Sequence, residues 1–585
     1  MRQILEKLCS LILELARGMF CRSPSGCHDR PRSLNDAMTK ISWLNEINTS
    51  NLRGDLFGGV TAAIVSLPLA LAFGVASGAG AEAGLYGAIL VGLFAALFGG
   101  TPTLISEPTG PMTVIMTAVL THLVASSPDQ GVAMAFTVVM IAGVFQILLG
   151  VLNLGKYISL MPYSVISGFM SGIGVILIIL QFPLLLGHDN PGGGVVGSLL
   201  ALPELLGDVR IYELILGAIT LAILMFFPKQ WANRVPPQLI ALVVGSLLAV
   251  TLFSAVDIRS IGEVSLGIPS LIVPTFTADQ WTQMVLDGVV LGTLGCIDAL
   301  LTAVIADSLT RQEHNARKEL IGQGVGNLVS GICGGLPGAG ATMGTVVNIQ
   351  SGARTALSGV TRALVLIVLV VFAAGLTAYI PLAVLAGIAI MVGVNILDWS
   401  FLKRAHRVSS SATLIMYGVM LLTIFVDLIV AVGAGVFIAN ILTIDRLSRL
   451  QSQNIHAISD ADDSIPLSVQ ERILFDKGKG RVMLMYFSGP MMFGVSRAIA
   501  RENENMSTHE TIVFDLTDVP LMDATVSLAI ENAVKDAAEK GKNVFIACPS
   551  VDTRERFQRM GLTDIVGKTN VVESRGEALE KAVAE

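Results

Sequence analysis

The sequence predicts an α-helical polytopic membrane protein followed by a small cytoplasmic α/β domain, and three observations carry this prediction. The 585 residues are 53% hydrophobic and only 14% charged, whereas soluble proteins have about 25% charged residues. Apolar stretches recur between about residues 55 and 443, each long enough for the ~20 residues that a helix needs to cross a bilayer. Charged residues then become frequent. We therefore expect a transmembrane domain over 48–445 and a linker with a soluble domain over 446–585.

Residues 1–47 are expected to form a cytoplasmic extension. Their apolar patch, residues 8–15, has Glu6 and Glu14 at its edges and no small-residue cleavage site, so it is a poor signal peptide and a plausible surface helix. The six cysteines of the chain show neither a pairing pattern nor CxxC spacing, and we interpret them as free thiols. The net charge of −7 argues against a nucleic-acid partner.

Proline, glycine and charged residues divide the transmembrane domain into fourteen expected spans, which begin near residues 56, 80, 108, 132, 162, 211, 236, 283, 319, 341, 363, 381, 410 and 430. Cytoplasmic loops collect Lys and Arg. With the N-terminus inside, the even-numbered connections contain Lys156, Lys229, Arg234, Arg311, Arg317, Lys318, Arg354, Arg362, Lys403, Arg404 and Arg407, and the odd-numbered ones contain only Arg210 and Arg259. We therefore expect both termini in the cytoplasm and the spans in the plasma (inner) membrane.

The fourteen spans split into seven and seven around the polar connection of residues 253–280. An odd number of spans in each half gives the halves opposite topology, as in many secondary transporters. The third span of each half is interrupted, by SEPTGP at 106–111 and by LPGAGAT at 336–342. Proline and glycine that merely kink a helix or allow close packing are the alternative for a single interruption. Two interruptions at matched positions favour a binding site built from broken helices.

Each interruption would start a half-helix inside the membrane. Its first backbone N–H groups lack partners and its dipole places about half a positive charge there, which suits an anion. Unpaired backbone groups cost several kcal/mol in hydrocarbon, so such a start is tolerated only beside a polar cavity. Thr109 and Thr342 lie near the two starts and could contact the anion; the alternative is that they only cap the helices.

Asp298 places a carboxylate inside an apolar span, with Thr302 four residues later on the same helix face. Such a carboxylate by default marks a site or an ion path, and we expect no other acidic residue of comparable depth in the second half. At ~5 Å and an effective dielectric of ~20, an anion and this carboxylate repel by roughly 3 kcal/mol. Either sodium intervenes, held by Asp298, Thr302 and carbonyls around Gly340, or Asp298 is protonated. The charge argument leaves both open.

Several motifs resemble the SulP family of anion transporters: residues 106–111, the helix around Asp298, GATMG at 340–344 and FDLTDVPLMDAT at 514–525. The resemblance covers about residues 50–585. Longer segments at 51–63, 161–170 and 306–311 are similar to bicarbonate-transporting members of the family.

This resemblance implies an inverted-repeat fold with core and gate subdomains, a homodimer in membrane lipid, and sodium-dependent bicarbonate symport by an elevator-like motion. By motif, it implies that bicarbonate contacts Thr109, Gly340, Ala341 and Thr342, and that sodium is held by Asp298, Thr302, Gly340 and Thr342. Many animal relatives carry an arginine near the position of Gly344. Its absence here fits sodium supplying the positive charge.

The tail alternates strand-like and helix-like segments, which predicts a small sheet with helices packed on it. We expect strands at 482–487, 511–516 and 543–547 and helices at 494–502, 523–539 and 553–560. The motif at 514–525 resembles the STAS domain of the SulP family and of anti-sigma-factor antagonists. Those antagonists carry a phosphorylated serine where this chain has Ala524, next to Thr525. The resemblance therefore favours a dimer-stabilising or protein-binding tail over a phosphorylated one.

Three other functions compete with sodium-dependent bicarbonate uptake. A proton-coupled sulphate permease would use Asp298 as a titrating group instead of a sodium ligand. An anion channel, or a membrane sensor with a regulatory tail, would not accumulate its ion against a gradient. An enzyme is disfavoured, because the seven histidines show no paired metal spacing and no nucleophile motif is present.

Overall fold

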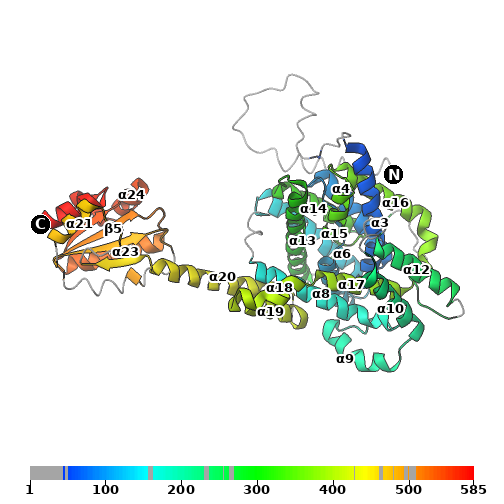
Figure 1. The fold of residues 1–585 in the computed structure, drawn as a ribbon. Coiled ribbons are helices and arrows are strands. Elements are labelled where there is room, and N and C mark those ends of the chain that lie inside the picture. Colours follow the sequence, from blue (N-terminus) through cyan, green and yellow to red (C-terminus); the bar gives the residue numbers. More distant parts are fainter. Residues whose placement is uncertain are drawn as a thin grey trace, which may run out of the picture. The chain divides into compact units, whose positions relative to one another are not determined.

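A computed structural model (Figure 1) describes residues 44–45, 51–155, 162–228, 236–253, 256–262, 269, 271–277, 279–426, 428–459, 465–478, 480–492, 498–499 and 509–584. Most of the expected N-terminal extension, 1–47, and most of the expected helix at 494–502 lie outside these residues. The chain divides into two compact units. The first is Met1–Leu160 with Ile176–Val394, and the second is Met161–Val175 with Asn395–Glu585.

Helices begin close to each of the fourteen expected span starts. They are α3 (Leu52–Ser77), α4 (Ala81–Phe98), α5 (Gly110–Ser126), α6 (Gly131–Val151), α8 (Tyr163–Leu185), α10 (Ile211–Phe226), α12 (Pro237–Thr251), α13 (Trp281–Thr310), α14 (Ala316–Ile332), α15 (Thr342–Gln350), α16 (Leu357–Thr377), α17 (Leu382–Ile396), α19 (Ser410–Phe425) and α20 (Leu428–Ser452). Two further helices, α9 (Gly194–Gly207) and α18 (Trp399–Val408), were not expected.

The number of membrane crossings stays a prediction. Within the described residues, seven helices are long and apolar enough to cross a membrane, or eight if the bent pair of α9 and α10 counts as one span. Shorter apolar helices such as α5, α12 and α19 have 15 to 17 residues, and a perpendicular crossing needs ~20. Of these, only α5 follows one of the two expected interruptions, which shorten a span.

Helix α14 is central to the packing of the first unit, because it lies against both α6 and α4. A methyl group added to Gly324 of α14 would lie 2.6 Å from the carbonyl oxygen of Gly143 in α6. The two backbones therefore approach too closely for any larger residue. Membrane helices without a hydrophobic driving force between them depend on such small-residue contacts.

The two expected interruptions meet in the first unit. Strand β1 (Ser106–Glu107) precedes α5, strand β2 (Ala339–Gly340) precedes α15, and the two pair in antiparallel register with Ser106 opposite Gly340 and Glu107 opposite Ala339. Each strand satisfies backbone groups of the other, as backbone inside a membrane protein requires. Two segments more than 230 residues apart in the sequence thus form one short sheet, and a half-helix follows each of its strands.

Six basic residues assigned to loops are helical. Arg317 and Lys318 lie in the first turn of α14, and Lys403, Arg404 and Arg407 lie in α18. Arg362 lies in α16 with no exposed surface. The loop assignment of Arg362 is therefore wrong, because the interruption before α15 makes residues 342–350 a short helix and α16 begins earlier than expected. The orientation argument loses one of its basic residues, and the cytoplasmic location of the termini stays a prediction.

The tail of the second unit contains a five-stranded sheet in the order β3-β4-β5-β6-β7 (Figure 1). Its strands are β3 (Ile455–Ile458), β4 (Val482–Ser488), β5 (Thr511–Asp518), β6 (Asn543–Ala547) and β7 (Val571–Val572). Strand β3 is antiparallel to β4 and the other neighbours are parallel. The three expected strands are confirmed as β4, β5 and β6, whereas the short edge strands β3 and β7 were missed.

Both faces of this sheet are covered, because apolar residues fill alternate positions on each side. In β5, Ile512 and Phe514 pack on the face of α23 (Ala524–Glu539), α24 (Val551–Arg559) and α25 (Leu562–Val566). Val513 packs on the opposite face with α21 (Val469–Lys477) and α26 (Arg575–Ala584). A single turn of 3₁₀ helix, Lys568–Asn570, precedes β7. The expected boundary at residue 445 lies within α20, which continues to Ser452.

Candidate functional site

The two half-helices begin with helix ends that no side chain caps. Thr109 is the residue before α5 and Ala341 is the residue before α15; both have extended backbone, and neither end has a side-chain capping hydrogen bond. The backbone carbonyl of each accepts the first helical hydrogen bond, at 2.9 Å from the nitrogen of Thr113 or Thr345. The amide of Ala341 itself donates to the carbonyl oxygen of Ile105 at 2.8 Å. The other first-turn amides and the positive dipole ends suit an anion.

The Thr109 hydroxyl faces the carboxylate of Asp298 in α13. Neither Thr109 Oγ1 nor Asp298 Oδ2 makes a hydrogen bond of good geometry with any described residue, and both atoms are buried. A buried polar atom without a partner costs about 1–3 kcal/mol, and more when it is charged. Two such atoms side by side at a half-helix start are therefore an arrangement that a bound ion would stabilise.

Thr302, one turn after Asp298, contacts the second half-helix directly. Its hydroxyl, which is completely buried, donates to the carbonyl oxygen of Gly340 at 2.8 Å and lies 3.0 Å from the hydroxyl oxygen of Thr342. A methyl group on Gly340 would lie 3.0 Å from Cα of Ala299 and 3.1 Å from Cβ of Thr302. Glycine therefore lets β2 approach α13 closely enough for this contact.

The structure thus brings three of the residues expected around sodium into contact, Thr302, Gly340 and Thr342, and it places Asp298 one turn earlier on α13, facing Thr109. They offer one carboxylate with hydroxyl and carbonyl oxygens, the donor set that hard cations prefer. No group of three or more His, Cys, Asp or Glu side chains suited to a metal occurs among the described residues. The donor set fits a singly charged cation better than a transition metal, which favours nitrogen or sulfur ligands.

One face of α14 holds the interrupted segments in place. Gln323 donates to Ser106 Oγ at 2.6 Å and to Glu319 Oε1 at 2.8 Å. Asn327 donates to the carbonyl oxygen of Gly338 and accepts from its amide, at 2.8 and 2.7 Å, and Ser330 donates to the Leu336 carbonyl at 2.7 Å. Sequence reasoning missed these residues, although polar side chains spaced four and three apart in an apolar helix share one face.

Glu319 overturns one expectation about the acidic residues. It lies in the first turn of α14 with 1% of its surface exposed, and its Oε2 accepts from the amide of Gly100 at 2.9 Å. The second half therefore contains a deeply buried acid besides Asp298. Glu319 is surrounded by hydrogen-bond donors, whereas one carboxylate oxygen of Asp298 has none among the described residues. The sequence does not show this difference, which indicates that Glu319 stabilises the fold whereas Asp298 has an oxygen free to bind a ligand.

A buried ion pair lies beside β1. Arg362 Nη2 donates to Glu107 Oε2 at 2.5 Å, and the two side chains are 0% and 3% exposed. Arg362 also donates to Ser66 Oγ at 2.9 Å and to the carbonyl oxygens of Ala88 and Ser106 at 3.0 and 3.1 Å. A single arginine thus connects α16, α3, α4 and β1. The signal that could have revealed it was an arginine among the apolar residues of 357–377.

Comparison with known proteins identifies the chain at this point. The profile of the sulfate permease family matches residues 52–419, and that of the STAS domain matches 476–578. The chain belongs to the sulfate permease family. It is 61% identical over 539 residues to the protein named bicarbonate transporter BicA of Synechocystis sp., an alignment that covers 92% of this chain and 96% of that protein.

Solved structures extend the comparison for this sulfate permease family member. The transmembrane domain of a cyanobacterial bicarbonate transporter BicA matches with a TM-score of 0.64 and 63% identity, covering 66% of this chain and 99% of that one. The murine Solute Carrier 26 family member A9 anion transporter, in its inward-facing state, matches with a TM-score of 0.80 over 98% of each chain. At 19% identity it shows the fold alone. The resemblance inferred from the motifs is confirmed, and the chain is a membrane transporter with a STAS domain and not an enzyme.

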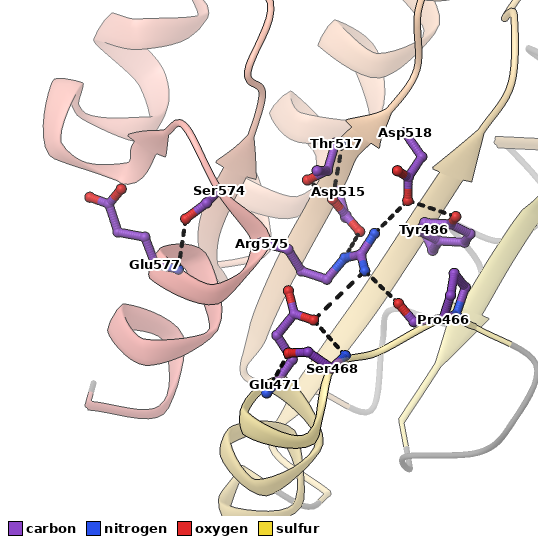
Figure 2. Close-up of polar contacts among 10 residues, drawn as sticks. All are labelled: Pro466, Ser468, Glu471, Tyr486, Asp515, Thr517, Asp518, Ser574, Arg575 and Glu577. Atoms are coloured by element: carbon purple, nitrogen blue, oxygen red, sulfur yellow. Dashed lines mark hydrogen bonds and ion pairs between the residues drawn. The ribbon is translucent and has the colours of Figure 1, made fainter.

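The acidic residues of the STAS motif serve the structure of the tail (Figure 2). Asp523 caps α23 by accepting from the amide of Val526 at 2.8 Å. Asp515 forms an ion pair of 2.5 Å with Arg575, the first residue of α26. Burial alone would lower the pKa of Arg575, but Asp515 and Asp518 hold the pKa above its usual value. The guanidinium therefore stays charged at neutral pH.

Proposed function

We propose that the chain is a secondary active transporter that takes up bicarbonate together with sodium. The observation that carries this proposal is the buried pair of Thr109 and Asp298, whose unpartnered oxygens lie at the start of one half-helix while Thr302 contacts the other. The 61% identity to a protein named as a bicarbonate transporter supports the substrate.

Bicarbonate would lie between the two half-helix starts, contacting Thr109 from one side and Gly340, Ala341 and Thr342 from the other. Sodium would take oxygens from Asp298, Thr302, Gly340 and Thr342. The two ions need each other, because bicarbonate and the carboxylate alone would repel by roughly 3 kcal/mol. Each ion should tighten the binding of the other by the same factor, as thermodynamic linkage requires.

The expected architecture completes the proposal. Seven-plus-seven inverted repeats would form core and gate subdomains, and an elevator-like motion would carry the site across the membrane. Support comes from the side chains of α14, which fasten both interrupted segments to one helix. Those elements would then move as one body. We also propose a homodimer stabilised by the STAS domain, in the plasma membrane with both termini in the cytoplasm.

Proton-coupled sulphate transport is the second candidate, favoured by the description of the family that the chain matches. A protonated Asp298 would donate a hydrogen bond to Thr109 and remove the need for a cation. The two candidates differ in their driving ion, so a measurement of uptake separates them.

The deciding experiment is uptake of labelled bicarbonate and of labelled sulphate into proteoliposomes of the full chain. We expect bicarbonate to accumulate above equilibrium under an inward sodium gradient and to stop accumulating without it. Sulphate accumulation driven by a pH gradient in the absence of sodium would overturn the proposal in favour of the permease. Passive equilibration without accumulation would show a channel.

A further inference from the structure

The Glu107–Arg362 ion pair has no role in the sodium and bicarbonate contacts proposed above, yet it lies at the same place in the fold. Glu107 is two residues before Thr109, and its backbone pairs with Ala339, two residues before Ala341. Two residues span at most ~7 Å. Its other carboxylate oxygen lies 3.3 Å from where a methyl group on Gly344 would be, in the first turn of α15. The pair therefore lies next to both half-helix starts.

Few charged side chains lie beside the two half-helix starts. Within the described residues they are Asp298, which faces Thr109, and the buried Glu107 and Arg362. The buried Glu319 is one side chain further away, because Gln323 joins it to Ser106 of β1. Asp298 has an unpartnered carboxylate oxygen, whereas Glu107 and Arg362 neutralise each other at 2.5 Å. Because no side chain extends from Gly344, nothing separates Glu107 from the start of α15.

We propose that Glu107 and Arg362 are a positioning pair that sets the sodium requirement of anion binding. This inference rests on the proposed function. The arginine ties β1 to α3 and α4 through Ser66 and Ala88, which fixes the half-helix start in space. Its charge is cancelled by Glu107, so it cannot attract the anion. The carboxylate that faces Thr109, that of Asp298, is then left for sodium to balance.

The proposal gives opposite consequences to the two single substitutions. E107Q leaves the guanidinium charge uncancelled beside the site, where it takes over part of the role of sodium. R362Q leaves a second carboxylate uncancelled, which increases the need for the cation. A unit charge at about 8 Å and an effective dielectric of ~20 changes affinity by roughly 30-fold. The double variant E107Q/R362Q removes both charges, so the net charge beside the site is the same as in the wild type.

The test measures bicarbonate affinity of the purified full-length protein with and without saturating sodium, by the bicarbonate-induced shift of its melting temperature and by uptake. The readout is the bicarbonate affinity measured without sodium, because a fixed charge shifts the affinities with and without sodium by the same factor and leaves their ratio unchanged. We expect E107Q to raise this sodium-free affinity by about tenfold or more, R362Q to lower it, and E107Q/R362Q to return it to the wild-type value. R362K, which keeps the charge but not the planar fork, should keep the sodium-free affinity while weakening the fold.

A matched control is E213Q. Glu213 in α10 forms a pair with Arg259, with Oε2 2.9 Å from Nη2, and its own side chain is 2% exposed, whereas Arg259 is 18% exposed and also pairs with Asp189. Helix α10 packs on α12, whereas β1 packs on α4 and β2 packs on α13. E213Q should lower stability and leave the sodium-free bicarbonate affinity unchanged. Equal sodium-free affinities in wild type, R362Q and R362K, with only stability altered, would overturn the inference and leave the proposed function intact. A wild-type protein whose bicarbonate affinity ignores sodium would overturn both.

Discussion

Arg362 in the first unit and Arg575 in the tail are both buried arginines paired with a carboxylate on a strand, but their surroundings differ. Arg575 reaches Asp515 and Asp518 and lies 3.9 Å from Glu471, and the last two carboxylates are 46% and 18% exposed. Arg362 meets one carboxylate and three neutral oxygens and has no exposed surface. Water screens the surplus negative charge in the tail, whereas every charge next to β1 must be balanced by another group of the protein or by an ion.

The difference indicates that an arginine–carboxylate pair stabilises the fold in the tail, whereas the pair next to β1 determines the net charge around the proposed ion site. Buried ion pairs contribute little net stability compared with apolar residues, but breaking one leaves an uncompensated charge. In a soluble domain that charge costs only stability. Next to an ion site, it also changes which ions bind.

Asp298→Asn should have the largest effect, because it removes the one buried carboxylate oxygen near β1 that has no partner. We expect sodium-driven bicarbonate uptake to be abolished, since both the main sodium ligand and the charge that requires sodium are lost. Residual anion binding should remain and should no longer respond to sodium. Uptake and bicarbonate-induced stabilisation check this, with D287N on the same helix as the control.

Sodium-stimulated uptake at the wild-type level in D298N would contradict the proposed coupling. The control is suitable because Asp287 lies eleven residues, about three turns, before Asp298 on the same helix, where it accepts a hydrogen bond from Gln283 at 2.9 Å. A similar loss in D287N would indicate that the helix, and not the site, was damaged.

Ala341→Phe should have the second-largest effect on bicarbonate uptake. Ala341 immediately precedes α15, and Thr302 contacts Gly340 and Thr342 on either side of it. A bulky side chain would fill the space in which the anion is proposed to lie, so the half-saturation constant for bicarbonate should rise at least tenfold or uptake should cease. Normal kinetics in A341F would rule out a site shared by the two half-helices.

Arg575→Met should destabilise the tail by about 3–5 kcal/mol, because Asp515 would remain buried without its partner. The thermal unfolding of the tail in the full chain measures this. The bicarbonate affinity measured without sodium should stay at the wild-type value, in contrast to R362Q. An exposed pair gives the control: K581A, which breaks the contact with Glu577, should change stability by no more than about 1 kcal/mol.

If R575M altered the sodium-free bicarbonate affinity as much as R362Q, the distinction between a structural and an electrostatic pair would fail. If it left the stability of the tail unchanged, the cost assigned to an unpaired Asp515 would be wrong.

The sequence was informative where hydrophobic pattern decides the structure. Strand β5 alternates apolar residues toward two helical layers, and its position was predicted to within two residues. The interruptions at 106–111 and 336–342 were found because proline and glycine have strong local consequences. Sequence reasoning also selected Asp298 and Thr302, which share a helix face in any α-helix.

What failed depended on contacts between distant residues. Arg362 was assigned to a loop because a basic residue near the expected end of a span usually lies in one, and its partner Glu107 is 255 residues away. Glu319 was overlooked because its burial depends on the backbone of Gly100. The polar residues of α14 support two segments whose pairing only the folded structure shows. The burial of a charged side chain depends on tertiary contacts, so it cannot be predicted from the sequence pattern alone.

Thr302→Ala should have the smallest effect, because it removes a neutral ligand and leaves the charges untouched. The hydroxyl donates to Gly340 O and lies 3.0 Å from Thr342 Oγ1, so its loss leaves a buried carbonyl without this donor, at a cost of about 1–3 kcal/mol. We expect the sodium half-saturation constant to rise about five- to tenfold, with maximal bicarbonate uptake retained at high sodium. T302S keeps the hydroxyl and is the matched control. Wild-type sodium binding in T302A would show that the hydroxyl is not a sodium ligand. Equal impairment of T302S and T302A would show that the site requires packing around the methyl group and not the oxygen. Either outcome would contradict the arrangement proposed here.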